Sequence, residues 1–128
     1  MLDASVAVRA ALAETWTTRW DNDDLTAPTL MWSEAASALR QLAMRGEISD
    51  TEATNAVRWL SESTIDAHAS ATLVVEAIEL AGQLGWAKTY DAEYVALARR
   101  LGASLITADA RLRRGVERVV SVRGPQEG

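Results

Sequence analysis

The chain of 128 residues fits one domain, and its 48% hydrophobic and 24% charged residues are ordinary for a globular protein. It has no cysteine and one histidine, His68, which excludes disulfides, iron–sulfur clusters, thiolate zinc sites and multi-histidine metal sites. Any metal site must therefore use mainly oxygen ligands, which favours Mg²⁺, Mn²⁺ or Ca²⁺. The net charge of −5 argues against simple electrostatic binding of nucleic acid, unless a divalent ion neutralises several acids.

No membrane span or signal peptide is recognisable, because the chain lacks a run of about 18 apolar residues and a charged, cleavable N-terminal segment. We therefore expect a cytoplasmic protein. The expected organisation is a single domain, residues 1–128, with a flexible tail rich in Gly and Pro at about 123–128.

The N-terminal segment predicts a short apolar start at Met1–Ala4 and then a helix from Val6 to Ala13. Trp16 and Trp20 lie one helical turn apart, so they extend this helix, form a second short one or offer a surface to a partner. The acidic run at 21–24 lacks the Gly and distal Glu of a calcium loop, and we interpret it as a solvated linker.

Two helices are predicted next, after a brief extended piece at 25–28 that ends in proline. Thr29 can cap the first, from about Leu30 to Arg45, and Gly46 ends it. The second runs from about Asp50 to Leu60, because Ser49-Asp50-Thr51-Glu52 fits a capping box.

The second half of the chain alternates between strand and helix patterns. A weak strand pattern at Thr64–Ser70 contains His68, which we interpret as structural. Two helices follow, one of them ending at Gly85 and the other running from about Thr89 to Gly102. The remaining elements are a buried strand at Ala103–Thr107, a short helix at Ala110–Gly115 and a last strand at Val119–Val122. This alternation predicts an α/β fold with a parallel sheet.

Four acids lie at predicted element boundaries, namely Asp3, Glu34, Asp91 and Asp109. Ligands of open parallel sheets bind outside the carboxyl ends of the strands, where helices that follow strands also begin. We therefore expect the four carboxylates to crowd together, which raises their pKa values unless a divalent cation removes the repulsion. The alternative is that each acid only caps a helix or complements its dipole.

The motifs around these acids resemble those of PIN domains. Asp3-Ala4-Ser5-Val6-Ala7-Val8 is similar to the opening motif of that family, and Trp32-Ser33-Glu34 to its second acidic motif. The segment Tyr90-Asp91-Ala92-Glu93-Tyr94-Val95-Ala96-Leu97-Ala98 resembles the third, and Thr107-Ala108-Asp109 resembles the fourth. The order, spacing and length are similar to those of VapC-type toxins of bacterial toxin–antitoxin pairs.

The resemblance implies a three-layer PIN-like fold, with a central parallel sheet of four to five strands flanked by helices. It also implies an endoribonuclease that depends on Mg²⁺ or Mn²⁺. Asp3, Asp91 and Asp109 would bind the metal, and Glu34 would bind a second metal, orient water or act as general base. Ser5 and Thr107 could hold these carboxylates in place, or could be ordinary strand-end hydroxyls.

Three features depart from the family pattern. The first strand has only two residues before Asp3, and Glu93 stands where an apolar residue is common. Because residues i and i+2 of a helix point apart, we expect Glu93 to face solvent. Arg111 and Leu112 occupy positions where some relatives carry another acid.

Candidate contacts to RNA phosphates are Arg111, Arg113 and Arg114, with Arg118 nearby, and the alternative is a solvated helix face. The resemblance also implies a homodimer and a cognate antitoxin that inserts a basic residue into the acidic site. Two other functions stay open. One is a PIN-like binding module without catalysis, and the other is a receiver-like phosphoacceptor, which lacks its paired acids and a suitably placed lysine here.

Overall fold

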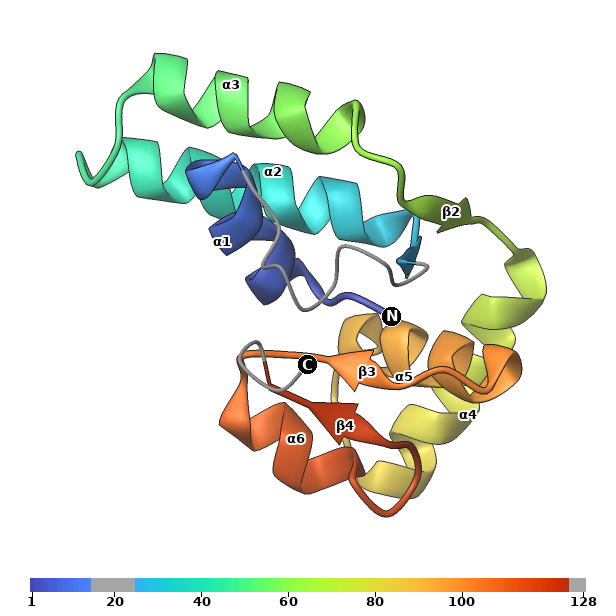
Figure 1. Ribbon diagram of the computed structural model, residues 1–128. Helices are drawn as coiled ribbons and strands as arrows, with labels where there is room; N and C mark the ends of the chain where they lie inside the picture. The colour runs from blue at the N-terminus through green and yellow to red at the C-terminus, as the bar shows by residue number, and fades with distance from the viewer. Residues whose placement is uncertain (15–24, 125–128) are drawn as a thin grey trace.

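The computed structural model describes residues 1–14 and 25–124, which contain six helices and four short strands (Figure 1). The helices are α1 (Ala4–Ala13), α2 (Leu30–Met44), α3 (Asp50–Ser61), α4 (Ala71–Leu84), α5 (Tyr90–Leu101) and α6 (Ala110–Val116). The strands are β1 (Thr26–Pro28), β2 (Asp66–His68), β3 (Leu105–Ile106) and β4 (Val122–Arg123). Trp16, Trp20 and the acidic run at 21–24 lie outside the described residues.

The N-terminal residues join two parallel ladders, β1–β2 and β3–β4, into one sheet. Leu2 forms a parallel bridge with Ile106, and its N–H donates to the Thr26 carbonyl at 3.0 Å on the other side. The N–H of Asp3 donates to the Ile106 carbonyl at 3.2 Å. The spatial order is therefore β2, β1, residues 1–3, β3, β4. The predicted parallel α/β sheet flanked by helices is confirmed.

This order places a topological switch point between residues 1–3 and β3, because the chain continues outward in opposite directions from these two neighbours. Such a switch point opens a crevice at the carboxyl ends of the strands, where open α/β sheets bind ligands. Asp3 is the last residue of the first of these segments, and Thr107 directly follows β3.

The strands are shorter than predicted, and the last one is displaced. The predicted strand at Val119–Val122 was wrong in its first half, because the N–H groups of Val119 and Val120 both donate to the Val116 carbonyl, at 2.7 and 3.0 Å. These bonds close the end of α6, so β4 begins only at Val122. Arg123, which we had assigned to the flexible tail, pairs with Ile106 in this ladder.

Helix boundaries follow the predicted caps with one exception. Ser49 and Glu52 form the capping box of α3, with reciprocal bonds of 3.0 and 3.1 Å between side chains and backbone N–H groups. Thr29 does not cap α2 with its side chain. Its backbone is already helical, and its N–H donates to the His68 carbonyl at 3.0 Å, which ties the start of α2 to β2.

The core lies between two groups of helices, with the N-terminus between them (Figure 1). Helices α1, α2 and α3 pack on one another, whereas α4 packs on α5 and α5 also contacts β1 and β3. The largest side chains with almost no exposed surface include Leu2, Met31, Leu39, Leu60, Leu73, Tyr94, Leu97 and Leu105. Among the described residues, no helix is both long and apolar enough to cross a membrane.

Candidate active site

Asp3 is buried at the switch point, and both of its carboxylate oxygens accept hydrogen bonds. Its Oδ1 accepts hydrogen bonds from the Ser5 hydroxyl at 2.6 Å and from the Val6 N–H at 3.3 Å, so that Asp3 caps α1. Its Oδ2 accepts a bond from the buried Thr107 hydroxyl. Burial raises the pKa of Asp3, the bonds from Ser5, Thr107 and Val6 oppose that effect, and the charge of Asp109 adds to it.

Thr107 and Ser5 connect the first strand segment to the loop after β3. The Thr107 hydroxyl accepts the N–H of Asp109 at 3.0 Å while it donates to Asp3. The Ser5 hydroxyl accepts the N–H of Ala108 at 3.3 Å while it donates to the same carboxylate. Both hydroxyls therefore bridge residues about a hundred positions apart in the chain, which a simple strand-end hydroxyl would not do.

Asp109 caps α6 and also faces the other acids. Its Oδ1 accepts the N–H groups of Arg111 and Leu112 at 2.9 and 3.2 Å. Asp3 and Asp109 are thus both helix caps, as the structural alternative required, yet their charges raise the pKa of Asp91 after the larger effect of burial. Arg111 lowers that pKa, which places its guanidinium near the same carboxylate. Asp3 and Asp109 therefore cap helices and also belong to the same group of acids as Asp91.

Glu34 reaches this group from α2 and is held by a tyrosine. The Tyr94 hydroxyl donates to Glu34 Oε1 at 2.5 Å. Burial raises the pKa of Glu34, the bond from Tyr94 lowers it, and the charges of Asp91, Asp3 and Glu93 raise it further. Burial and the negative charge of Glu34 raise the pKa of Tyr94 well above its usual range.

The sequence did not reveal two of these participants. No role was assigned to Tyr94 from the sequence, although a tyrosine buried to 1% exposure needs a partner for its hydroxyl. Glu93 was expected to face solvent, and its side chain is in fact partly buried, with its charge acting on Glu34. Burial raises the pKa of Glu93 as well.

A pocket of about 610 Å³ opens beside these carboxylates. Its lining includes Glu34, Asp91, Asp109 and Arg111, together with the loop of residues 85–90. The hard oxygen donors and their mutual repulsion fit a divalent cation such as Mg²⁺ or Mn²⁺. Within residues 1–14 and 25–124, no three acidic or histidine side chains are close enough around one point to form a ligand set as they stand.

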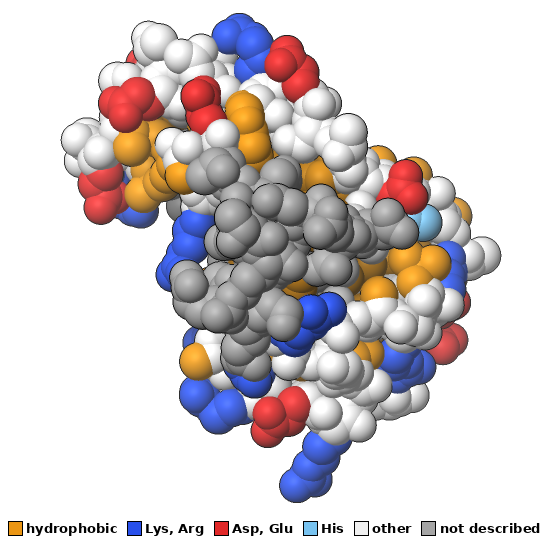
Figure 2. Space-filling model, viewed as in Figure 1, with side chains coloured by type: hydrophobic (Ala, Val, Ile, Leu, Met, Phe, Trp, Pro, Cys, Tyr) orange, Lys and Arg blue, Asp and Glu red, His pale blue; other side chains and the backbone are white. Residues whose placement is uncertain are grey.

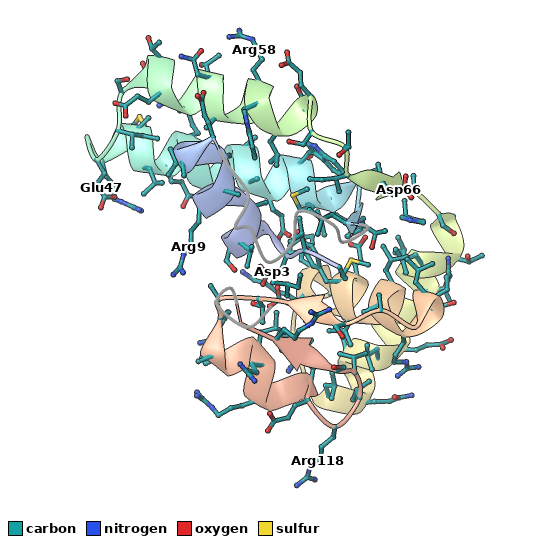
Figure 3. The ribbon with its side chains drawn as sticks, viewed as in Figure 1. Asp3, Arg9, Glu47, Arg58, Asp66 and Arg118 are labelled. Carbon is teal, nitrogen blue, oxygen red and sulfur yellow. The ribbon has the colours of Figure 1, made fainter. Side chains whose placement is uncertain are left out.

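The arginines of α6 differ in their relation to the pocket. Arg111 lines it, whereas Arg113 and Arg114 do not appear in its lining. Arg118 points outward at the far end of the molecule from Asp3 (Figure 3). On the face shown in Figure 2, basic side chains gather over the half that contains α6 and β4, and acidic ones over the half that contains α2 and α3.

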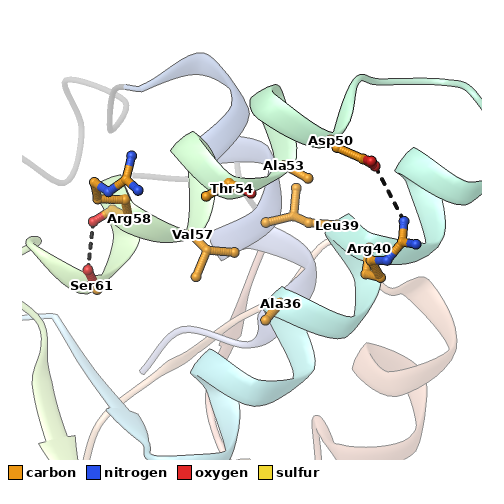
Figure 4. Close-up of a pocket in the computed structure, with 9 residues that line it drawn as sticks. All are labelled: Ala36, Leu39, Arg40, Asp50, Ala53, Thr54, Val57, Arg58 and Ser61. Carbon is orange, nitrogen blue, oxygen red and sulfur yellow. Dashed lines mark hydrogen bonds and ion pairs between the residues drawn. The ribbon is translucent and has the colours of Figure 1, made fainter.

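A second pocket lies between α2 and α3 and contains none of the four acids (Figure 4). Its wall combines Leu39 and Val57 with Arg40, whose guanidinium pairs with Asp50 at 3.4 Å. Because its only carboxylate is already paired with a cation, this pocket offers no group for acid–base or metal chemistry, and the candidate active site is the carboxylate pocket.

Comparison with known proteins agrees with this geometry. The family model described as PIN domain matches residues 1–117. The chain belongs to the PIN domain family. It is 33% identical over 113 residues to VapC ribonuclease Mb0985 of Mycobacterium bovis and to Ribonuclease VapC9 of Mycobacterium tuberculosis, covering 88% of this chain and 87% of each relative. It is 37% identical over 81 residues to Ribonuclease VapC3 of Pyrobaculum aerophilum, covering 62% of this chain and 61% of the relative.

The fold of this PIN domain also matches a solved structure, PAE2754 from Pyrobaculum aerophilum, with a TM-score of 0.74. The match covers 98% of this chain and 82% of the other, at 23% sequence identity, and thus bears on the fold alone. Membership of the PIN domain family removes the receiver-like alternative.

Proposed function

We propose that this PIN domain is a divalent-metal-dependent endoribonuclease that acts as the toxin of a toxin–antitoxin pair. The observation that carries the proposal is the 33% identity, over 88% of the chain, to proteins named VapC ribonuclease. Three acids, Glu34, Asp91 and Asp109, line one pocket, and the charge of Asp3 at the switch point acts on Glu34 and Asp91, which supports the same activity. A binding module without catalysis would have no use for such mutually repelling carboxylates.

Asp3, Asp91 and Asp109 are the residues that would hold Mg²⁺ or Mn²⁺. Such an ion lowers the pKa of a water molecule and stabilises negative charge on a phosphate. Asp3 is fixed by the hydroxyls of Ser5 and Thr107, whereas the side chains of Asp91 and Asp109 are exposed to solvent. Asp3 gives the site its position, and the exposed side chain of Asp91 in the first turn of α5 can adjust to the ligand.

Glu34 is the best candidate for orienting or deprotonating a water molecule. Its half-buried carboxylate has a raised pKa, which suits a group that must accept a proton near neutral pH. The bond from Tyr94 fixes one carboxylate oxygen. Arg111, near Asp91, is placed to contact a phosphate of the RNA, and Arg113 and Arg114 are candidates farther along α6.

Cleavage of structured RNA by the purified protein tests this function. Wild type should cut in Mg²⁺ or Mn²⁺ and stop in EDTA, and Asp3→Asn or Asp91→Asn should reduce the rate at least about 100-fold. Glu47→Gln is the matched control, because Glu47 is an exposed acid paired with Arg45 at 2.8 Å, outside the carboxylate pocket. Cleavage that survives EDTA, or survives both aspartate substitutions, would refute the proposal.

A small basic segment of a cognate antitoxin is the proposed inhibitor of this site. Support comes from the raised pKa values of Asp3, Glu34 and Asp91, because a cationic side chain inserted among them would relieve both repulsion and desolvation. A tagged copy of the protein should co-purify with the untagged small protein encoded beside it, and added antitoxin should stop cleavage. Purification of the toxin alone from cells that express both proteins would contradict this.

A homodimer is the proposed assembly. Helix α4 carries three neighbouring exposed apolar side chains, Val74, Val75 and Ile78, at 52%, 55% and 61% exposure. The same three side chains of a second copy of this chain could pack against them and remove this apolar surface from water. Light scattering should give twice the mass of the 13.9 kDa chain, and Ile78→Glu should give the monomer mass. A monomeric wild type would exclude the dimer.

A further inference from the structure

One wall of the carboxylate pocket has no role in the chemistry described above. The loop of residues 85–90 consists of the connection from α4 to α5 and Tyr90, the first residue of α5. Its residues Trp86, Lys88 and Tyr90 all line the pocket that Asp91 and Asp109 share. Lys88 is the only lysine of the chain and is exposed. The Tyr90 side chain is 52% exposed although it is a large aromatic ring.

Trp86 fixes the position of this wall. Its backbone N–H donates to the Ala81 carbonyl at 2.8 Å, which holds the loop to the end of α4. On the other side the indole lies against Gly115 of α6, where an added Cβ would come within 3.2 Å of Trp86 Cζ2. The loop is therefore anchored between α4 and α6 before any ligand binds. The ammonium group of Lys88 and the aromatic ring of Tyr90 are exposed to solvent and available for binding.

Tyr90 and Tyr94 occupy the same side of α5, because they are four residues apart in one helix. Tyr94 is buried and bonded to Glu34, whereas Tyr90 has an exposed ring and no apolar core to fill. An exposed aromatic ring beside a lysine and an arginine is the combination by which proteins hold single-stranded nucleic acid, where the ring stacks on a base and the cations contact phosphates.

We propose that the loop of residues 85–90 forms a subsite for one single-stranded nucleotide next to the cleaved bond. Tyr90 stacks on its base, and Lys88 with Arg111 contacts its phosphate. The assignment rests on the proposed ribonuclease function and names the residues that position the RNA strand in the pocket. Stacking on a ring favours no particular base, so this subsite contributes affinity and position more than sequence preference.

Binding of two fluorescein-labelled strands tests the subsite, a 12-nucleotide oligouridylate and an abasic strand of equal length. Anisotropy is measured in EDTA and low salt, where a metal-dependent enzyme leaves the RNA intact. Tyr90→Ala should weaken oligouridylate binding by roughly 5- to 100-fold and leave abasic binding unchanged, and Tyr90→Phe should bind both strands as wild type does. Lys88→Ala should weaken both strands and reduce the salt slope by about 0.7. Arg118→Ala, which removes an arginine that points away from the site, should change neither.

Several results would overturn the subsite. They are Tyr90→Ala weakening both strands equally or neither, Lys88→Ala leaving the salt slope unchanged, and wild type failing to bind oligouridylate. Both residues are exposed, so unchanged melting temperatures are expected and exclude misfolding as the cause. The binding measurement needs no cleavage. A protein that binds as expected but never cuts RNA would refute the ribonuclease and keep the nucleotide site, whereas cleavage without these binding losses would do the reverse.

Discussion

The hydroxyl of Tyr94 and the carboxylate of Glu34 are joined at 2.5 Å although 60 residues separate them in the chain. Tyr94 lies in α5 and is 1% exposed, and Glu34 lies near the start of α2. The bond therefore ties together the two helices that bring Asp91 and Glu34 to the pocket. A tyrosine in this position acts through the carboxylate that it holds, and we regard it as a positioning residue.

Tyr94→Phe should lower kcat about tenfold with little change in KM, because the ring still fills the core while Glu34 loses the hydroxyl that donates to its Oε1. Steady-state cleavage kinetics measure kcat and KM separately. The pH profile of kcat should move to higher pH, since the hydrogen bond that lowers the pKa of Glu34 is gone. Glu47→Gln, which changes an exposed side chain outside the carboxylate pocket, is the control. An unchanged kcat and pH profile would show that Glu34 needs no positioning.

Thr107→Val should destabilise the protein by about 1–3 kcal/mol, because the buried Oδ2 of Asp3 loses its donor and the Asp109 N–H loses its acceptor. Thr26→Val is the same substitution at a buried hydroxyl that has no hydrogen-bond partner among the described residues, and it should be neutral or stabilising. Urea unfolding of both variants measures the difference. Equal effects would mean that the bond to Asp3 contributes nothing to stability.

Asp91→Asn should raise the melting temperature of the metal-free protein at pH 7.5. Burial and the charges of Asp109 and Asp3 raise the pKa of Asp91 above its usual 3.8, so the folded state binds the proton more tightly than the unfolded chain. Stability is therefore lost as the pH rises above that value, and the gain from Asn should vanish near pH 3.8.

Scanning calorimetry in EDTA at the two pH values measures that difference. Added Mn²⁺ should then raise the melting temperature of wild type more than that of Asp91→Asn, because a ligand stabilises only the form that binds it. A variant that melts below wild type at pH 7.5 in EDTA would contradict the repulsion between these acids.

Gly82→Ala should stabilise the protein by about 0.5–1 kcal/mol, since Gly82 lies inside α4 and its added Cβ meets no atom within 4 Å. Gly85→Ala is the contrasting substitution, because Gly85 ends the same helix with φ of 72°. Alanine is strained in this left-handed region, so this variant should be less stable than wild type. Thermal unfolding of the pair checks the prediction, and a gain at both positions would be inconsistent with it.

Much of this fold was readable from local pattern. Apolar periodicity, the capping box at Ser49 and the glycines after α4 and α5 gave the helices within a few residues. Strand limits were harder, because a strand ends where its neighbour's hydrogen bonds end, and that depends on residues far away in the chain. Thus Val119 and Val120 have strand-forming side chains but are used to close α6.

The acids were found because each stands at an element boundary, but the reasons for their convergence were only partly visible. Asp91 begins a helix that follows another helix, so its place depends on the packing of α4 against α5 and not on the strand rule. Tyr94 and Glu93 were missed because helical periodicity assigns a side chain to a face, and only the tertiary structure shows what that face meets.

The position of residues 1–3 in the middle of the sheet governs when activity can arise during synthesis. Asp3 leaves the ribosome about a hundred residues before Ile106 and Thr107, yet its strand needs Ile106 and its fixed geometry needs Thr107. Closing contacts across about a hundred residues is entropically costly and slow. A nascent chain that has not yet exposed β3 therefore lacks the Asp3–Thr107 bond and the acid that follows it. A site built in this order is completed only after β3 has left the ribosome, so an inhibitor that is already present can meet the site as it forms.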